Sequence, residues 1–125
     1  MTLTKLLAIV LVVALSPGCS KSSGGSNSLH VLQSATGPVL LEFWATWCGP
    51  CKQLAPVIAE IEKERPSSVI VRKIDIDKNP KIAQQFGVQS IPTMVLVLKG
   101  TERGRLVGAV DKNRVLAFIK ESLAK

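Results

Sequence analysis

The sequence is poor in the residues that most metal and nucleic-acid sites require. Three cysteines and one histidine in 125 residues are too few for a disulfide framework or a four-cysteine zinc site. Three phenylalanines, two tryptophans and no tyrosine provide no series of rings for stacking bases, so we expect no nucleic-acid partner. The length excludes a multidomain enzyme, and the hydrophobic content of 46% excludes a disordered chain.

Acidic residues are also scarce. The 16 lysines and arginines outnumber the 9 aspartates and glutamates, which gives a formal net charge of +7. The basic residues are scattered along the chain, so we interpret most of them as a solvated surface that would favour anionic lipids near a membrane.

Residues 1–18 are typical of an export signal. Lys5 precedes the apolar run Leu6–Leu15, which is ten residues long. As a helix, ten residues extend about 15 Å, roughly half of a bilayer's hydrocarbon core, so we do not expect a permanent membrane span. Small residues then lead to Cys19.

The end of this signal, Ser16-Pro17-Gly18-Cys19, resembles that of a bacterial lipoprotein, in which the cysteine is acylated and becomes the mature N-terminus. This resemblance implies a lipid at Cys19 and a protein anchored on the extracytoplasmic side of an envelope membrane. The alternative is an ordinary secretory signal in which Cys19 is incidental. Polar residues complete the segment 19–28, which we interpret as a flexible tether.

Residues 29–125 are expected to form one α/β domain, because buried-strand and amphipathic-helix patterns alternate along them. The pattern predicts a mixed sheet with helices on both faces. We expect strands at Val39–Ala45, Val69–Asp75, Thr93–Leu98 and Gly104–Ala109, and helices from Leu29 to near Gly37, from Gly49 to about Arg65, from Pro80 to about Phe86, and after Asp111 with an apolar stripe of Val115, Leu116, Ile119 and Leu123.

Cys48 and Cys51 are the candidate reactive residues. The run Trp47-Cys48-Gly49-Pro50-Cys51 lies where a buried strand ends and a helix begins. A helix N-terminus favours an anion and should lower the pKa of the Cys48 thiol, whereas Cys51 is one turn inside and shielded. Redox chemistry is the favoured interpretation. A structural disulfide or a zinc site is the alternative, but so short a loop stabilises little and zinc needs about four ligands.

Several motifs together resemble the thioredoxin family over residues 29–125. They are FWATWCGPCK at Phe43–Lys52, KIDIDKNP at Lys73–Pro80, FGVQSIPT at Phe86–Thr93 and VGA at Val107–Ala109. The resemblance implies the thioredoxin fold. The stretch that matches the family's first strand is the serine- and glycine-rich tether, so we expect that strand to be missing. The sheet would then have four strands, with Val69–Asp75 at an edge.

The resemblance also implies residue roles. Cys48 matches the attacking thiol and Cys51 the resolving thiol. Ile91-Pro92 matches a segment whose cis proline faces the disulfide and whose preceding backbone pairs with the substrate. The remaining matches form the active-site loop and the flat apolar docking surface: Trp47, Gly49, Pro50, Val107 and Gly108.

Glu42 and Lys73 match a buried acid and its partner lysine, which help the family to deprotonate the resolving cysteine through water. The family most often has aspartate where this chain has Glu42. A carboxyl group within the apolar run VLLEFWA must be paired or neutral, and burial should raise its pKa. The alternative is a solvent-facing position on an edge strand.

The predicted function is a thiol–disulfide oxidoreductase that reduces protein disulfides in the cell envelope. We expect a monomer that needs no metal and no cofactor other than the Cys48/Cys51 pair. A membrane electron donor or a thioredoxin reductase-like donor would regenerate the dithiol. The alternatives are a net oxidant or isomerase, and an assembly subunit that uses the docking surface without turnover.

Overall fold

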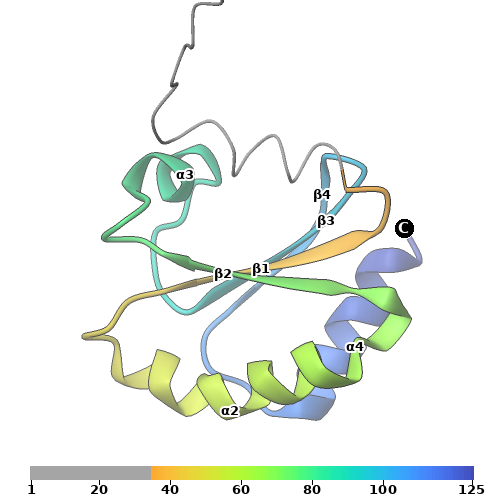
Figure 1. The fold of residues 1–125 in the computed structure, drawn as a ribbon, viewed down its shortest axis with the longest axis horizontal. Coiled ribbons are helices and arrows are strands. Elements are labelled where there is room, and N and C mark those ends of the chain that lie inside the picture. The colour runs from red at the N-terminus through yellow and green to blue at the C-terminus, as the bar shows by residue number, and fades with distance from the viewer. Residues whose placement is uncertain (1–34) are drawn as a thin grey trace, which may run out of the picture.

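The computed structural model describes residues 35–125, which form a mixed four-stranded sheet with helices on both faces (Figure 1). The sheet order is β2-β1-β3-β4, with β1 parallel to β2, antiparallel to β3, and β3 antiparallel to β4. The predicted sheet is confirmed. The strands are β1 (Pro38–Trp44), β2 (Ile70–Asp75), β3 (Thr93–Leu98) and β4 (Thr101–Val107), and the helices are α2 (Gly49–Glu64), the 3-10 turn Pro66–Ser68, α3 (Pro80–Gln85) and α4 (Lys112–Leu123).

Several predictions concern residues outside this range. The signal at 1–18, the lipid at Cys19, the tether, the helix from Leu29 and the missing first strand all involve residues 1–34 wholly or in their main part. None of the helices within residues 35–125 has the length and apolar character needed to cross a membrane.

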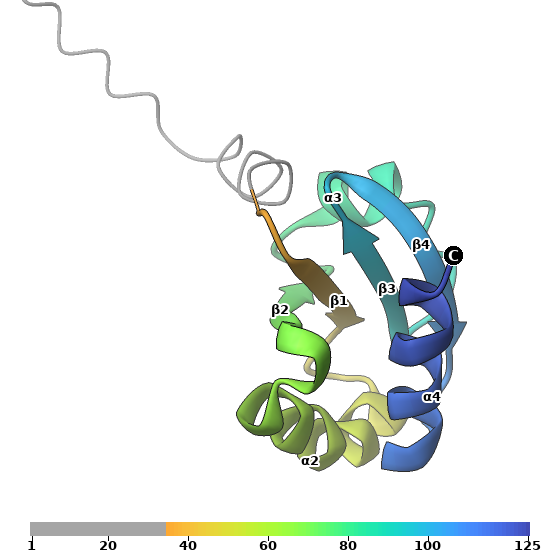
Figure 2. The same ribbon diagram turned by 90° about the vertical axis from the view of Figure 1, so that its right-hand side faces the viewer.

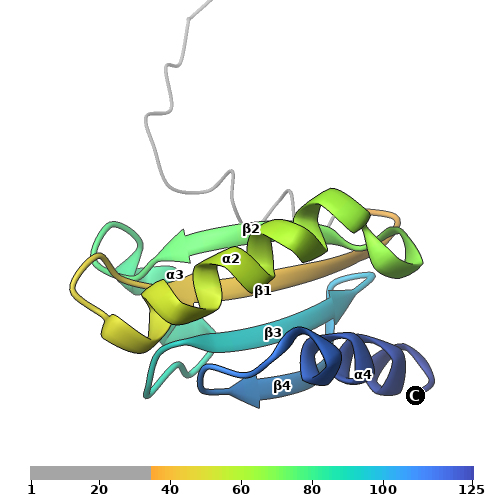
Figure 3. The same cartoon turned by 90° about the horizontal axis from the view of Figure 1, so that it is seen from below.

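The core has two layers because β1 is apolar on both faces. Leu40 packs with α2 and α4, whereas Val39, Leu41 and Phe43 pack on the opposite face, where α3 lies. The views in Figures 2 and 3 show α2 and α4 together on one side of the sheet and α3 on the other. The apolar run at 39–45, which the sequence analysis assigned to a buried strand, is thus buried on both faces of the sheet.

Capping residues mark the start of α4 and the end of α2. The Asp111 carboxylate accepts a hydrogen bond of 2.8 Å from the backbone N–H of Arg114, which caps α4. Arg65 adopts φ 48° and ends α2 in a left-handed cap. On α4 the predicted stripe is partly correct. Val115 and Ile119 are buried, Leu116 and Leu123 are partly buried, and Phe118 and Ser122, which the prediction omitted, are buried as well.

The fourth strand was predicted at Gly104–Ala109 but extends from Thr101 to Val107. Lys99 and Gly100 both have positive φ, at 51° and 76°, so the hairpin turns in two residues and Leu98 pairs with Thr101 at once. The first half of β4 is polar because the strand lies at an edge of the sheet. A bulge between Leu96 and Val97 interrupts the register. Within residues 35–125, strand β2 forms the other edge of the sheet.

Candidate active site

Cys48 and Cys51 form a disulfide at the start of α2, with their Cα atoms 5.3 Å apart. Cys48 is the N-cap residue, and its Sγ accepts a hydrogen bond of 3.2 Å from the backbone N–H of Cys51. Gly49 and Pro50 are exposed and form the first turn of the helix. A thiolate at Cys48 would therefore be stabilised by the free amides of this turn.

The loop before β3 lies against the disulfide, although it is about forty residues away in sequence. The Ile91–Pro92 peptide bond is cis, as the resemblance implied. The Sγ of Cys48 lies 3.9 Å from the carbonyl oxygen of Ile91. The hydroxyl of Thr93 donates a hydrogen bond of 2.6 Å to the carbonyl of Ser90, which ties the loop to the strand that follows it.

Two exposed apolar side chains flank the disulfide region. Among the described residues, Trp47 and Val107 are the large hydrophobic side chains that stay exposed, at 66% and 52%. Val107 is paired with Thr93, next to Pro92, and the N–H of Gly108 donates a hydrogen bond of 2.8 Å to the carbonyl of Pro92. The structure thus brings the predicted docking residues together from three separate parts of the chain.

Asp77 is a site residue that the sequence analysis missed. Its carboxylate accepts a hydrogen bond of 2.8 Å from the indole Nε1 of Trp47. Its own N–H donates to the carboxylate of Asp75, at 3.0 Å, so the loop after β2 is organised around a buried acid. The sequence analysis placed Asp75 at the end of a strand and gave Asp77, which lies in the motif KIDIDKNP, no role of its own.

Trp47 and the loop before β3 border an open pocket of about 280 Å³, which is also lined by Ile91, the residue whose carbonyl faces Cys48. Both apolar and polar residues line it. The lining residues are Trp47, Ile76, Val88, Gln89, Ser90 and Ile91.

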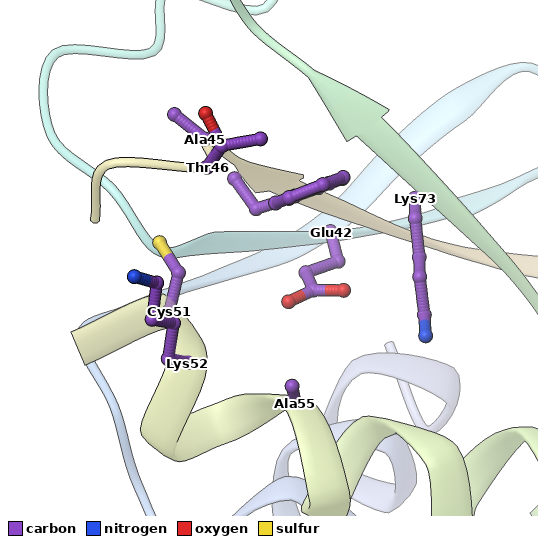
Figure 4. A pocket seen from close by; sticks show the side chains of 8 residues that line it. Glu42, Ala45, Thr46, Cys51, Lys52, Ala55 and Lys73 are labelled. Atoms are coloured by element: carbon purple, nitrogen blue, oxygen red, sulfur yellow. The ribbon is translucent and has the colours of Figure 1, made fainter. Parts of the chain in front are cut away.

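Glu42 is buried on β1, with 3% of its surface exposed, so the solvent-facing alternative is wrong. Burial raises the pKa of its carboxyl, while the nearby Lys73 ammonium lowers it and Glu62 raises it. A second pocket, of about 180 Å³, is lined by Glu42, Cys51 and Lys73 among others. Figure 4 shows these three side chains around this pocket, with the Glu42 carboxyl between the other two in this view. Water in this pocket could connect Glu42 to Cys51.

Lys73 is placed opposite Glu42 by the parallel pairing of β1 with β2. Its Nζ forms an ion pair with Oε2 of Glu62 on α2, at 3.8 Å. No ion pair between Lys73 and Glu42 is found within residues 35–125. Glu62 was not predicted as a site residue, because its position on an amphipathic helix is typical of a solvent-exposed residue.

The comparisons with known proteins agree with this geometry. The thioredoxin family model matches residues 25–121. The thioredoxin of Mycobacterium tuberculosis is 51% identical over 101 residues, which cover 81% of this chain and 86% of that protein. The thioredoxin of Rickettsia felis is 46% identical over 86 residues, which cover 69% of this chain and 82% of that protein.

One further relative is much longer. The bifunctional thioredoxin reductase/thioredoxin of Mycobacterium leprae is 51% identical over 88 residues, which are 70% of this chain and 19% of that protein. The match to the family model and the identity to the two shorter relatives are sufficient to assign this chain to a family. With a disulfide between Cys48 and Cys51 at the start of α2, the chain belongs to the thioredoxin family and is a thiol–disulfide oxidoreductase.

Proposed function

We propose that the protein reduces protein disulfides in a bacterial cell envelope, held there by a lipid on Cys19. The observation that carries the exchange chemistry is the Cys48–Cys51 disulfide, which lies at a helix N-terminus and against the loop of Ile91. A substrate segment that pairs with the Ile91 backbone would place its own disulfide beside Cys48.

The proposed reaction has two exchange steps. The Cys48 thiolate attacks one sulfur of the substrate disulfide, forms a mixed disulfide and releases the other sulfur as a thiolate, which takes up a proton. The Cys51 thiolate then attacks the Sγ of Cys48 and expels the second substrate sulfur, which is protonated in turn. The substrate gains two electrons and two protons, and the Cys48–Cys51 disulfide is the oxidised product.

Glu42 is the proposed proton acceptor for Cys51. Its carboxyl group and Cys51 border the same pocket, and burial raises the pKa of that carboxyl. A carboxyl group with a raised pKa is a better base than an ordinary one, so it is suited to take the thiol proton through water when the mixed disulfide is resolved. Lys73 would stabilise the ionised form of Glu42.

The topology suits an anchor at the N-terminus. Strand β1 begins at Pro38, where the β3–β4 hairpin turns, and ends beside the disulfide loop (Figures 1 and 3). A seven-residue strand extends about 20 Å, so the two ends of β1 are separated by most of the domain. A tether from Cys19 would then present Cys48 away from the membrane.

The net direction of the exchange, reduction of the substrate, is inferred from the Gly49-Pro50 dipeptide. This dipeptide resembles that of reducing thioredoxins, whose redox potential is about −270 mV. Reduction in the envelope needs a donor of two electrons for each cycle. We propose a membrane dithiol donor or a thioredoxin reductase-like protein. The name of the Mycobacterium leprae relative, in which thioredoxin reductase and thioredoxin are joined, supports the second type of donor.

Two measurements test the chemistry. The redox potential of the full chain should lie near that of reducing thioredoxins, and a value well above about −200 mV would show a net oxidant or isomerase instead. The Cys51→Ala variant should retain clients from envelope extracts as mixed disulfides on Cys48. The matched variant Cys48→Ser/Cys51→Ala should retain none, and equal capture by both variants would contradict the proposed attack.

The anchor is tested separately by the mass of the protein isolated from bacterial membranes. We expect a chain that starts at Cys19 and carries acyl groups, and a Cys19→Ser variant that leaves the membrane fraction. A chain that carries no lipid, or that still begins at Met1, would remove the anchor from the proposal and leave the exchange chemistry intact.

A further inference from the structure

The ammonium group of Lys73 interacts with two carboxyl groups, those of Glu42 and Glu62. Lys73 is the β2 residue directly opposite Glu42, and it lines the pocket that Glu42 shares with Cys51. Its Nζ, however, lies 3.8 Å from Oε2 of Glu62, on the outer part of α2. The Lys73 and Glu62 side chains are 41% and 54% exposed, so this ion pair forms at the surface rather than inside the pocket.

Two charged groups act on Glu42, Lys73 from β2 and Glu62 from α2. The pocket is also lined by Lys52 and by Cys51 of the disulfide, both from α2. Lys73 and Glu62 act on the pKa of Glu42 in opposite directions, because the ammonium favours the carboxylate and a second carboxylate disfavours it.

The position of the ammonium group decides how much of its field reaches Glu42. Coulomb energy falls with distance, and solvent screens charges at the surface more strongly than charges inside the pocket. A carboxylate that draws the Lys73 ammonium outward therefore leaves the buried carboxyl with less support for its ionised form. A glutamate at position 62 has this effect without touching Glu42 or the disulfide.

We propose that Glu62 is a positioning residue, which holds the Lys73 ammonium at the surface and thereby sets the pH range in which Glu42 can accept a proton from Cys51. The inference rests on the proposed function of Glu42. It concerns the resolving step only, because neither Glu62 nor Lys73 contacts Cys48. Attack by Cys48 on a substrate disulfide should be the same with or without the Glu62 charge.

The test follows resolution in the full chain, by stopped-flow release of a fluorescent thiol from a mixed disulfide on Cys48 across a pH series. The rate should fall on the acidic side as Glu42 becomes protonated. In Glu62→Gln this acidic limb should move to lower pH, with a rate about 1.4- to 5-fold above the parent on the limb, the range expected for an exposed ion pair. Glu62→Asp should lie between the two.

The matched control is Glu60→Gln, which removes the same charge from the same helix but from a pair with Lys112. The acidic limb of Glu60→Gln should lie at the same pH as that of the parent. High salt should reduce the difference in limb position between Glu62→Gln and the parent. An equal shift in both variants would reduce the effect to net charge and overturn the proposal.

Two more variants distinguish a failure of the proposed role of Glu42 from a failure of the proposed role of Glu62. In a Lys73→Met background Glu62→Gln should shift the limb less, and a full shift there would show that Glu62 acts directly and not through Lys73. Glu42→Gln should abolish the limb. If the limb persists in Glu42→Gln, the proposed role of Glu42 fails and that of Glu62 with it. If Glu42→Gln abolishes it and Glu62→Gln leaves it in place, only the inference about Glu62 is wrong.

Discussion

On the face of the sheet that α3 covers, β1 contributes Val39, Leu41 and Phe43, all buried among apolar side chains. On the face that α2 covers, the same strand contributes Leu40, then Glu42, then Trp44 beside the disulfide. The first face is uniform along its length. The second changes from core to active site within five residues.

The difference shows that the groups needed for the reaction, which are unfavourable to bury, lie on one face of β1. A buried carboxyl group is unfavourable unless it is neutral or paired, so burial raises the pKa of Glu42, which lines a pocket on its face of the sheet. Among residues 35–125, β1 presents only apolar side chains to the opposite face, where they pack in an apolar cluster. We therefore expect substitutions on the two faces to separate stability from activity.

Phe43→Ala should produce the largest loss of stability. Phe43 is fully buried and its ring lies 5.6 Å from that of Phe86, so truncation leaves a cavity that neighbours fill only in part. The free energy of unfolding should fall by about 3–5 kcal/mol, measured by urea titration. In the fraction that stays folded, the alkylation rate of reduced Cys48 should match the parent. A loss below about 1 kcal/mol would show that the α3 face is not the main support of β1.

Gly104→Ala tests the contact between the outer strand and α4. A methyl group at Gly104 would collide with the hydroxyl of Ser122 and meet the ring of Phe118 at 3.0 Å. Overpacking of this kind costs about 1–3 kcal/mol, which thermal or urea unfolding can measure. The double variant Gly104→Ala/Ser122→Gly should recover part of the loss. If Gly104→Ala alone is neutral, α4 adjusts freely and the packing on this side of the sheet is looser than that around Phe43.

The same contrast explains how much the sequence could predict. The alternation of strands and helices and the cis bond before Pro92 were both predictable, the second through the family motif. Each depends on local pattern or on a motif with strict spacing. The start of β4 was not predictable from apolar pattern, since an edge strand can be polar and its pairing begins from the positive-φ turn at Lys99-Gly100.

Two residues of the site could be recognised only in the three-dimensional structure. Glu62 reads as solvated surface on an amphipathic helix, and only the packing of α2 against β2 brings it to Lys73. Asp77 lies thirty residues from Trp47, and no sequence pattern links an indole N–H to that carboxylate. Residues whose role depends on long-range pairing are the ones that sequence patterns fail to reveal.

Glu42→Gln should change how stability depends on pH. The pKa of Glu42 in the folded chain is raised above its ordinary value of 4.5, so the folded state holds this proton more tightly than the unfolded state does. Its contribution is therefore fully present below pH 4.5 and is lost as pH rises through the folded pKa. Relative to Glu42→Gln, which does not titrate, the parent should lose stability over that window, by at most about 1.4 kcal/mol per pH unit.

Urea unfolding of the parent and of Glu42→Gln across a pH series measures this difference. Leu41→Val, a change on the opposite face, is the control: it should lower stability by a constant amount at every pH. A constant offset between Glu42→Gln and the parent would mean that the carboxyl group is solvated in the folded chain, which would remove the contrast between the two faces at this position.

Asp77→Ala should have the smallest effect on stability and a local effect on the docking surface. The hydrogen bond from Trp47 is exposed, so its loss should cost about 0.5–1.5 kcal/mol or less. The indole would then be free to turn, since 66% of the Trp47 surface has no protein contact. The indole N–H resonance of Trp47 should shift in NMR spectra while that of Trp44 stays in place, and substrate reduction should show a higher KM with kcat little changed. If kcat falls as well, Asp77 also affects the exchange steps, and the division between a docking surface above the disulfide and a proton pocket behind it would have to be redrawn.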